Sequence, residues 1–453
     1  MSEEALNQLD AETGEPAPEG LPLPAPNMPE PLSMGAVMRI APMRRLWYAQ
    51  IVSLFGDFLA LYAVITFMTF TLHATAPQVT GIQIAYMGPI AILGILAGVF
   101  VDRWPVKITL VASDYIRSAL CLLLLAVHSA IGFYAVLAAI SIFSSFFQPA
   151  QGKALRSIVP LHGMRSAQAL IQQVMFIMRI VGGPIAIVIV SNPSLGPAAC
   201  YKLDALSFLA SGTLIATIPL VIPKLSAVMQ KPEGKSAVVV SPEASEKSGI
   251  ARVLEDMKQG MNFIFHHAAL LFVILALAAA MFVMGCFGPL IAIYVRDILH
   301  AKGRTFSITA AMIGIGLMLG INLLNAFAKK AKHTHLVYFG LAGIAAGTMF
   351  LAALPYLWSA ILGLLLIGFA AGAIIIPSQT MIQQETPQAM LGRVGSTVMS
   401  VIFSAQILGL ILSGILTTYI SVREVFGICT LMLAVLVVIG KVWMEPKDHP
   451  AMA

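Results

Sequence analysis

The sequence predicts an all-α membrane protein with twelve transmembrane helices in two six-helix halves. Three observations carry this prediction: long uncharged apolar segments, a one-sided distribution of lysine and arginine, and a motif that recurs along the chain. Hydrophobic residues make up 58% of the 453 residues, whereas soluble domains contain about 45–50% apolar residues. No Asp, Glu, Lys or Arg occurs from Phe58 to Val101 or from His333 to Gln384. Segments of that length cross a bilayer, because one crossing needs roughly 20 apolar residues.

Twelve apolar segments are long enough to cross a membrane, six on each side of a central polar stretch. We expect them at residues 47–71, 83–101, 108–128, 131–151, 168–191, 199–221, 269–295, 305–327, 335–354, 357–377, 394–418 and 424–443. The chain then divides into an N-terminal tail at 1–43, a first half at 44–222, a central loop at 223–267, a second half at 268–443 and a C-terminal tail at 444–453.

The N-terminal tail and the central loop differ in character. The stretch from Met1 to Met38 contains seven acidic residues, no lysine or arginine, and many prolines. Such a segment cannot bury enough apolar surface to order itself, so we expect an acidic, proline-rich tail that is disordered through residue 43. In the central loop, apolar residues at helical spacing predict an amphipathic helix on the membrane surface. They are Ile250, Val253, Leu254, Met257, Met261 and Ile264.

The positive charges predict the orientation of the chain. Twenty lysine and arginine residues fall on the side of the tails, and four fall on the other side: Arg296, Lys302, Arg304 and Arg423. By the positive-inside rule both termini are cytoplasmic, and we expect a multi-pass protein of the cell (inner) membrane. Because the basic residues lie at membrane boundaries, orientation explains the net charge of +6 and the pI near 9.1 without a nucleic-acid partner.

A motif recurs at equivalent places in the two halves. After the fourth segment the sequence reads PAQGKALRSIVP (149–160), followed by Arg165, and after the tenth it reads PSQTMIQQETP (377–387), followed by Arg393. Both copies contain Pro-x-Gln, a second proline and the arginine. This pattern favours two halves related by a parallel repeat. The alternative is that prolines simply end helices wherever they occur.

The stretch GVFVDRWPVK (98–107) places an acid, two bases and a proline between the second and third segments. It resembles the loop 2–3 signature of the major facilitator superfamily, Gly-x-x-x-Asp-Arg-x-Gly-Arg-Lys. The matching residues are Gly98, Asp102, Arg103 and Lys107, while Pro105 replaces the second glycine and Val106 an arginine. The resemblance implies the major facilitator fold and a breakable cytoplasmic latch that favours the outward-open state. In that latch the glycine admits a close neighbouring helix, and the aspartate accepts from a helix end and a basic partner.

Four further stretches narrow the resemblance. They are similar to the drug:proton antiporter group of macrolide exporters and the enterobactin exporter, and the resemblance covers roughly residues 45 to 443. The four stretches are SLFGDFLALYAV, ASDYIRSAL, FFQPAQGKALRSIVP and IIPSQTMIQQETPQAMLGRVGS. The resemblance implies a secondary active transporter that exports amphipathic organic compounds of the drug, macrolide or siderophore type by alternating access, in exchange for protons. Gly182-Gly183-Pro184 is similar to the antiporter signature Gly-Pro-x-x-Gly-Gly, although Ile187 and Val188 stand at its last two glycines and span four lacks the arginine typical of other proton-coupled drug exporters. These three residues form either a hinge or an ordinary small-residue packing site.

Charged residues inside the membrane are candidate functional residues. Each costs at least about 2.5–3.5 kcal/mol on insertion scales, so it needs a partner, a cavity or a function. The first half carries Asp57, Asp114, Arg117, Arg179, Lys202 and Asp204, and none lies in the middle of segments seven to twelve. The helical rise of about 1.5 Å per residue places Asp57 and Arg179 near the midplane. We interpret Asp57 as a proton carrier and Arg179 as its competing cation. The alternatives are a static pair between helices one and five, or bonds from Asp57 to backbone groups around Gly56.

The other membrane charges lie nearer the ends of their segments. Asp114 and Arg117 lie three residues apart on one helix face, close enough to pair with each other or with the latch. We expect a structural role for them, with substrate contact as the alternative. Lys202 and Asp204 lie near the outer end of the sixth segment, where an outer gate or simple solvation would explain them. The candidate proton-coupling or substrate-binding residues are therefore Asp57, Arg179, Asp114, Arg117 and Asp204.

The sequence carries no enzyme motif. A P-loop, a Gly-x-Ser-x-Gly motif and a zinc-ligand pattern are absent, and the four cysteines form neither a disulfide framework nor a metal site. We therefore expect no catalytic residue, cofactor or metal, and a monomer driven by an ion gradient or by the substrate's own gradient. The partners of such a secondary transporter are a small amphipathic organic substrate, protons and the lipid bilayer. The alternatives are a lysophospholipid flippase, whose family shares the FGD stretch, and a non-transporting scaffold or sensor.

Overall fold

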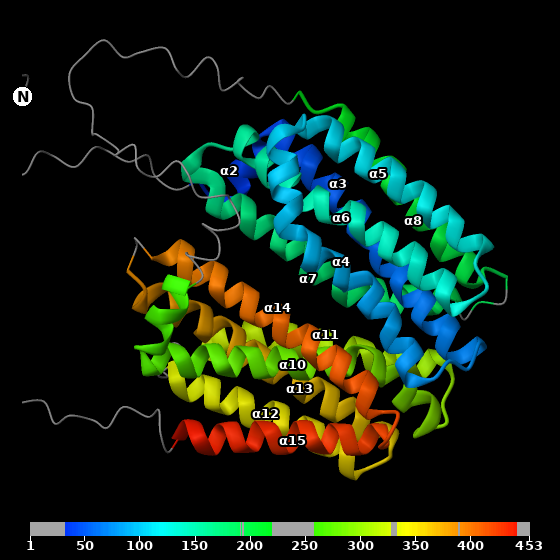
Figure 1. The fold of residues 1–453 in the computed structure, drawn as a ribbon, viewed down its shortest axis with the longest axis vertical. Coiled ribbons are helices and arrows are strands. Elements are labelled where there is room, and N and C mark those ends of the chain that lie inside the picture. Colours follow the sequence, from blue (N-terminus) through cyan, green and yellow to red (C-terminus); the bar gives the residue numbers. More distant parts are fainter. Residues whose placement is uncertain are drawn as a thin grey trace, which may run out of the picture.

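Twelve long helices make up most of the described chain (Figure 1). The computed structural model describes residues 32–190, 192, 194–219, 258–327, 333–387 and 390–441. Within these ranges no strand occurs, and the long helices are α3 (Ala41–Thr66), α4 (Ala76–Arg103), α5 (Val106–Leu123), α6 (Ala130–Ile158), α7 (Met164–Val190), α8 (Gly196–Ala216), α10 (Ala268–Asp297), α11 (Gly303–Phe327), α12 (His333–Ala353), α13 (Leu357–Glu385), α14 (Leu391–Leu416) and α15 (Val422–Ile439). Nine of the described helices are long and apolar enough to cross a membrane, and α4, α7 and α8 pack among them. The predicted all-α membrane fold is confirmed.

The helices follow the predicted segments, but two of them run past their predicted ends. The sequence predicts ends at residues 151 and 377, whereas α6, which contains Pro149, continues to Ile158 and α13, which contains Pro377, continues to Glu385. A proline inside a helix removes one backbone hydrogen bond. Packing of α6 on α4 and α5, and of α13 on α11 and α12, outweighs this loss. Pro149 and Pro377 therefore lie inside equivalent helices, and the alternative that prolines simply end helices is wrong for them, whereas Pro160 and Pro387 follow the ends of α6 and α13.

The chain becomes ordered earlier than the sequence predicts. A short helix, α2 (Met34–Arg39), precedes α3, and Ser33 caps it by accepting from the backbone N–H of Ala36 at 3.2 Å. Val37 and Met43 are fully buried and join the core of the first half. Apolar side chains at the end of the acidic tail therefore hold it against the helices. The expectation of disorder is wrong for residues 32–43.

The tails and most of the central loop lie outside the described ranges. These are residues 1–31, 220–257 and 442–453, which include Ile250, Val253, Leu254 and Met257 of the predicted amphipathic helix. Residues 258–265 are helical, and Ile264 within them is buried. This part of the predicted helix therefore turns an apolar residue toward the protein rather than toward a membrane surface.

Two groups of six helices form the halves of the molecule, an upper group in blue to green and a lower group in lime to red in Figure 1. In the first half, α3 packs on α7 and α8, α6 packs on α4 and α5, and α5 packs on α8. The second half repeats these contacts: α10 packs on α14 and α15, α13 packs on α11 and α12, and α12 packs on α15. The halves meet through α7 with α11 and through α4 with α14. The same helix pairs therefore build both halves.

The repeat has a constant period. The helices α3 and α10 begin at 41 and 268, and α6 and α13 begin at 130 and 357. The difference in residue number is the same for both pairs, and we call it the repeat offset. It extends into the turns that follow the first helix of each half, where Leu-His-Ala occurs at 72–74 and at 299–301. His73 and His300 both have a φ of 49°, which is uncommon for a residue other than glycine. The duplication therefore reaches backbone detail that the Pro-x-Gln motif alone does not indicate.

Glycines bring the backbones of α11 and α13 into direct contact in the second half. A Cβ on Gly316 would collide with the carbonyl oxygen of Leu365, and a Cβ on Gly368 would collide with that of Ile313. Small residues allow such close approach between membrane helices, where apolar side chains gain little by leaving the lipid. Backbone packing rather than charge therefore holds this pair of helices together.

Replacing Gly368 by alanine is expected to lower the Tm of the purified protein in detergent. The added methyl group pushes α11 and α13 apart, and overpacking of this kind typically costs about 1–3 kcal/mol. Gly427→Ala in α15 is the matched control, because a Cβ on Gly427 meets nothing within 4 Å and alanine favours a helix. Equal Tm values for the two variants would contradict the packing argument.

The two halves touch at one end of the molecule. We call this end the distal side, where residues 72–75 and 297–303 lie, and the opposite end, where α2 lies, the terminal side. On α4, the Gln83 amide lies against Gly288 of α10. Gly94 follows three turns later on the same face of α4, and a Cβ on it meets nothing within 4 Å. The halves have therefore separated along α4 between these two positions.

The facing helix α14 shows the same change along its length. Gly414 lies against Thr80 of α4, whereas Phe403, three turns nearer the terminal side on the same face, is 52% exposed. Figure 1 shows the two groups of helices drawing together at the distal side and spreading toward α2. The structure is therefore a conformation that is open toward the terminal side.

Candidate functional site

Four buried charged side chains lie between α3, α5, α6 and α8 in the first half. Asp57 on α3 is 9% exposed, Asp114 and Arg117 on α5 are 0% and 3% exposed, and Asp204 on α8 is 1% exposed. We call these four residues the charged cluster. Burial of charge is costly unless each group is paired and hydrogen-bonded, so the neighbours of each side chain determine what the cluster can do.

Arg117 lies at the centre of the charged cluster. Its Nη2 donates to Asp114 Oδ1 in a close ion pair, and its Nη1 lies 4.0 Å from Asp57 Oδ2. Its guanidinium carbon lies 4.6 Å from the ring centre of Phe147 on α6 and 4.3 Å from that of Phe208 on α8. Cation–π contacts of this kind stabilise a desolvated arginine. One guanidinium therefore serves two carboxylates, one closely and one at the edge of ion-pair range.

Neutral donors complete the coordination of the carboxylates. Ser211 Oγ donates to Asp114 Oδ2 at 2.7 Å. Cys121 Sγ donates to Asp204 Oδ2 at 2.9 Å, and Ser207 Oγ donates to Asp204 Oδ1 at 3.3 Å. A neutral donor bonds to a carboxylate but brings no opposite charge to a buried one. Among the described side chains, Asp204 is therefore held by a thiol and a hydroxyl rather than by a cation.

Gly56 permits the approach of α3 and α8 within the charged cluster. A Cβ built on Gly56 would collide with Asp204 Oδ1 and Ser207 Oγ. The groups beside Gly56 are thus side chains of α8, and the alternative that Asp57 bonds to backbone groups around this glycine stays a prediction. The Phe-Gly-Asp sequence therefore brings the carboxyl of α3 and the carboxyl of α8 onto facing helix surfaces.

The second half contains a neutral version of the contact between Cys121 and Asp204. Thr348 Oγ1 and Thr430 Oγ1 are 2.7 Å apart, between α12 and α15. Thr348 follows Cys121 by the repeat offset, and Thr430 follows Asp204 by one position less. The helices α12 and α15 correspond to α5 and α8. The equivalent helix pair of the second half is therefore joined by two hydroxyl groups, where the first half has a thiol and a carboxyl.

The second half also replaces the close ion pair with apolar residues. Leu341 and Ile344 follow Asp114 and Arg117 by the repeat offset, and both are fully buried. Helices arranged in the same way therefore pack without charge at these positions. We therefore expect that the fold of the first half does not require these charges.

The structure brings together four of the five candidate coupling residues. Asp114 and Arg117 form the pair that their spacing predicts. Asp57 has Arg117 as its described cationic neighbour. The side chain of Arg179 on α7 lies outside the described part of the structure, so its pairing with Asp57 stays a prediction.

Asp204 lies deeper than the sequence predicts. The predicted segment begins at residue 199, but α8 begins at Gly196, which moves Asp204 further from the helix end. Its side chain also faces α3 and α5, and at 1% exposure simple solvation does not describe it, while the outer gate stays a prediction. Lys202, two residues before it, is exposed. The expected location near the interface is therefore wrong for Asp204.

Sequence reasoning missed the neutral neighbours of the charged cluster: Cys121, Phe147, Phe208, Ser207 and Ser211. A signal was available in the spacing i, i+3, i+7, which places polar residues on one face of an apolar helix. This spacing occurs at 114, 117 and 121 on α5 and again at 204, 207 and 211 on α8. The two polar faces meet in the structure.

The predicted latch residues lie at the terminal end of α4 and the start of α5. Arg103 is the last residue of α4 and is exposed, Lys107 is half-buried, and the side chain of Asp102 lies outside the described part of the structure. A Cβ on Gly98 meets nothing within 4 Å. The close helix approach expected at this glycine does not occur in the terminal-open conformation, and the latch itself stays a prediction.

Gly182, Gly183 and Pro184 lie inside α7, where it packs on α3. A Cβ on Gly182 would collide with the Phe58 side chain, and a Cβ on Gly183 would press on the ring of Tyr62. α7 continues past the proline to Val190. These contacts favour small-residue packing over a hinge at this position.

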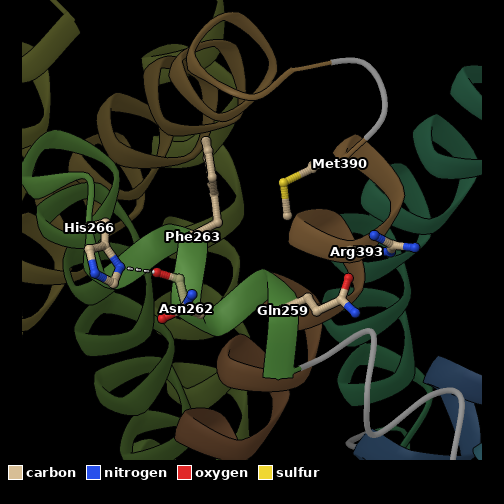
Figure 2. A pocket seen from close by; sticks show the side chains of 6 residues that line it. All are labelled: Gln259, Asn262, Phe263, His266, Met390 and Arg393. Carbon is tan, nitrogen blue, oxygen red and sulfur yellow. Dashed lines mark hydrogen bonds between the residues drawn. The ribbon is translucent and has the colours of Figure 1, made fainter.

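A separate pocket of about 450 Å³ lies on the terminal side of the second half (Figure 2). Its lining comes from the helix at 258–265 and from the start of α14: Gln259, Asn262, Phe263, His266, Met390 and Arg393. His266 Nδ1 lies 2.7 Å from the backbone carbonyl oxygen of Asn262. The pocket shares no residue with the charged cluster and contains none of the predicted coupling residues.

The sequence matches the profile of the Major Facilitator Superfamily over residues 46–409. It is also 26% identical over 418 residues to the "Uncharacterized MFS-type transporter YfiS" of Bacillus subtilis (strain 168), in an alignment that covers 88% of this chain and 93% of that protein.

Solved transporter structures share the fold. A bacterial homologue of the human lysosomal transporter Spinster, in an inward-facing and unoccupied conformation, aligns with a TM-score of 0.66 at 12% identity and covers 88% of this chain and 95% of its own. The nucleoside transporter NupG aligns with a TM-score of 0.61 at 14% identity and covers 88% and 98%. A POT family transporter in complex with 5-aminolevulinic acid aligns with a TM-score of 0.63 at 10% identity and covers 92% and 98%. At these identities the likeness concerns the fold.

Proposed function

The chain belongs to the major facilitator superfamily, and from this membership we propose that it is a secondary active transporter that exports small amphipathic organic compounds in exchange for protons. It is an integral membrane protein of the major facilitator type. In the proposal it works as a monomer by alternating access in the cell (inner) membrane. Both termini are then cytoplasmic, and the terminal side of the structure faces the cytoplasm.

The charged cluster is the observation that carries the proposal. Three buried carboxyl groups share it with Arg117, the one basic side chain that the described residues place there. If all three carboxyls were ionised, one guanidinium would face three negative charges, in an interior where an unpaired charge costs several kcal/mol. Binding of protons removes that cost. We therefore assign the cluster to the binding of the coupling ion.

Arg117 supplies a means of exchange between carboxyls. It is closely paired with Asp114 and lies 4.0 Å from Asp57. When Asp57 releases its proton, its carboxylate competes with Asp114 for the guanidinium, and when Asp57 is protonated the guanidinium returns to Asp114. Because Asp57 and Asp114 are on different helices, each proton transfer changes the attraction between α3 and α5. In this way protonation changes the packing of the first half.

The substrate would lie between the two halves near the midplane, where this fold binds its substrates. No acidic or basic residue occurs in the middle of α10 to α15, and Phe403 of α14 is exposed on the face that turns toward the first half. An apolar wall suits a hydrophobic or weakly basic compound, since no charged group has to lose its hydration without a partner. The terminal-open conformation would admit such a compound from the cytoplasmic side, which is the loading step of export.

The test is substrate-dependent proton movement by the purified chain in liposomes that contain a pH-sensitive dye. A pH gradient is imposed, and macrolides, cationic dyes, siderophores and lysolipids are added one at a time. Proton movement that requires one of these compounds supports the antiport. Lysolipid flux without proton movement contradicts it and favours a lysophospholipid flippase, the second candidate, which the Phe-Gly-Asp sequence on α3 favours.

Replacing Cys121 and Asp204 by threonine, the residue that forms the equivalent contact in the second half, tests whether these two residues serve proton coupling or the fold. The variant Cys121→Thr/Asp204→Thr is expected to fold, because Thr348 and Thr430 form the equivalent contact between α12 and α15. We expect it to keep substrate binding but to lose most substrate-dependent proton movement in the same liposomes. Lys202→Gln is the control, since that side chain is exposed on the same helix. Native proton movement in the threonine variant would exclude Asp204 from coupling.

A further inference from the structure

Arg296 joins the two halves on the distal side. It belongs to α10, and its Nη1 donates to the backbone carbonyl oxygens of Thr69 at 2.9 Å and of Ala74 at 2.7 Å. Both carbonyls belong to the stretch that leads from α3 into α4. One side chain of the second half therefore bonds twice to the backbone of the first half.

The carbonyl at Thr69 is one that needs an outside donor. Thr69 lies in η1 (Phe67–Thr71), the π-helical turn that ends the first long helix, and the last carbonyls of a helix lack an intrahelical partner. A helix C-terminus also carries partial negative charge, which attracts a cation. Asp297 holds the guanidinium in place, accepting from Nε at 2.6 Å and from Nη2 at 2.9 Å. Asp297 thus orients the guanidinium of Arg296, and the two carbonyl oxygens of the first half accept its hydrogen bonds.

The contact occupies a special position in the repeat. Arg296 follows Thr69 by the repeat offset, so the two are equivalent residues of the two halves. Arg296 therefore lies opposite Thr69, its equivalent in the first half, close to the axis that relates the two halves. Arginines at both positions would repel each other across this axis. The chain carries one arginine and one threonine, so one half supplies the donor and the other the acceptors.

An apolar seal lies near this contact. The ring of Phe306 on α11 lies 6.3 Å from that of Tyr62 and 6.1 Å from that of Phe70, both of the first half. Phe306 is fully buried. Separation of the halves here therefore costs the apolar contact and the bonds of Arg296 together.

We propose that Arg296 is a gating residue that holds the distal side closed. This inference rests on the alternating access of the proposed function, because the distal side has to open for the substrate to leave. Opening moves α10 away from the stretch between α3 and α4, so Arg296 has to release both carbonyls. The contact therefore shifts the conformational equilibrium toward the terminal-open state.

Arg423 is a matched control for this proposal. It lies at the start of α15, also on the distal side, and donates through Nε to the carbonyl of Ala352 at 2.8 Å and through Nη2 to that of Ala353 at 2.9 Å. It makes the same kind of bond to carbonyls at a helix end. Both of its partners belong to the second half, so its loss does not affect the contact between the halves.

The test measures distances between spin labels by pulsed EPR in liposomes. The distal pair is His128→Cys with Tyr419→Cys, and the terminal pair is Arg156→Cys with His335→Cys. Each pair places exposed positions on opposite halves. All four native cysteines are buried, so the labels attach to the introduced ones.

In the Arg296→Ala protein we expect longer distal distances and shorter terminal distances, with the ratio of distal-open to distal-closed molecules rising about tenfold. Arg296→Lys keeps the charge as a single ammonium group and should shift the ratio less, and it provides the test if the alanine variant does not fold. Arg423→Ala should give native distances. Unchanged distances in both Arg296 variants, or an equal shift in Arg423→Ala, would overturn the gate. A shift in a protein that moves no protons upholds the gate and refutes the antiport alone.

Discussion

Asp57→Asn is expected to abolish pH-driven transport while the protein stays folded. Asparagine keeps the shape of the side chain but has no proton to exchange at this site, so the first helix can neither load nor release one. The fold survives because the close partner of Arg117 is Asp114, whereas Asp57 lies 4.0 Å away. The measurement is substrate-dependent proton movement in liposomes, which should fall to the level of vesicles without protein.

Substrate counterflow provides the control for Asp57→Asn. Exchange of labelled for unlabelled substrate needs no net proton movement, so we expect the variant to retain it. Lys202→Gln, which changes an exposed charge of the same half, should behave as the native protein in both assays. Native proton movement in Asp57→Asn would remove Asp57 from coupling. Loss of counterflow together with a lower Tm would instead assign it the structural role.

Arg117→Ile is expected to lower the stability of the protein more than any other single change in the charged cluster. It leaves Asp57 and Asp114 buried without their cation, and removing one partner of a buried pair typically costs about 3–5 kcal/mol. It also removes the guanidinium from between Phe147 and Phe208. The measurement is the Tm in detergent, followed through the loss of monodisperse protein.

A second substitution should restore that stability without restoring transport. Asp114→Leu combined with Arg117→Ile copies Leu341 and Ile344, the buried equivalents in the second half. Replacing a buried ion pair by apolar residues of similar volume is often neutral or stabilising. We therefore expect the Tm of the double variant to approach the native value while its pH-driven transport is lost. A double variant as unstable as Arg117→Ile would show that the charges are required by the fold.

The helices were predictable because membrane crossing imposes a length and a composition that few other structures share. The boundaries that failed depended on contacts between helices. The predicted segments end at residues 151 and 377, beside Pro149 and at Pro377, yet neighbouring helices keep α6 and α13 continuous to Ile158 and Glu385. Residues 32–43 follow an acidic, proline-rich stretch, yet Val37 and Met43 bury their side chains in the first half. Composition predicts whether a segment forms a membrane helix, and packing against other helices determines at which residue that helix begins or ends.

The sequence predicted which residues belong to the candidate site better than it predicted the contacts between them. The cost of charge in a membrane identified Asp57, Asp114, Arg117 and Asp204, and the structure places all four in the charged cluster. It did not identify Arg117 as a neighbour of Asp57, because that contact depends on how α3 and α5 pack. The depth of Asp204 depended on a helix start three residues earlier than predicted. Cys121 is a neutral residue with no cost to reveal it, and only its helical spacing from Asp114 and Arg117 marks it.

The glycine contacts between α11 and α13 have a mechanical consequence. Backbones that touch at Gly316 and Gly368 cannot slide or tilt without steric collision, whereas α3, α5 and α8 meet through side chains that can exchange hydrogen-bond partners. We therefore expect the contact between α11 and α13 to be stiffer than the contacts among α3, α5 and α8. A bilayer whose thickness does not match the protein strains its helices, and we expect that strain to fall on the less stiff contacts, which include the buried carboxyls. Lipid thickness should consequently alter the efficiency of coupling as well as the speed of transport.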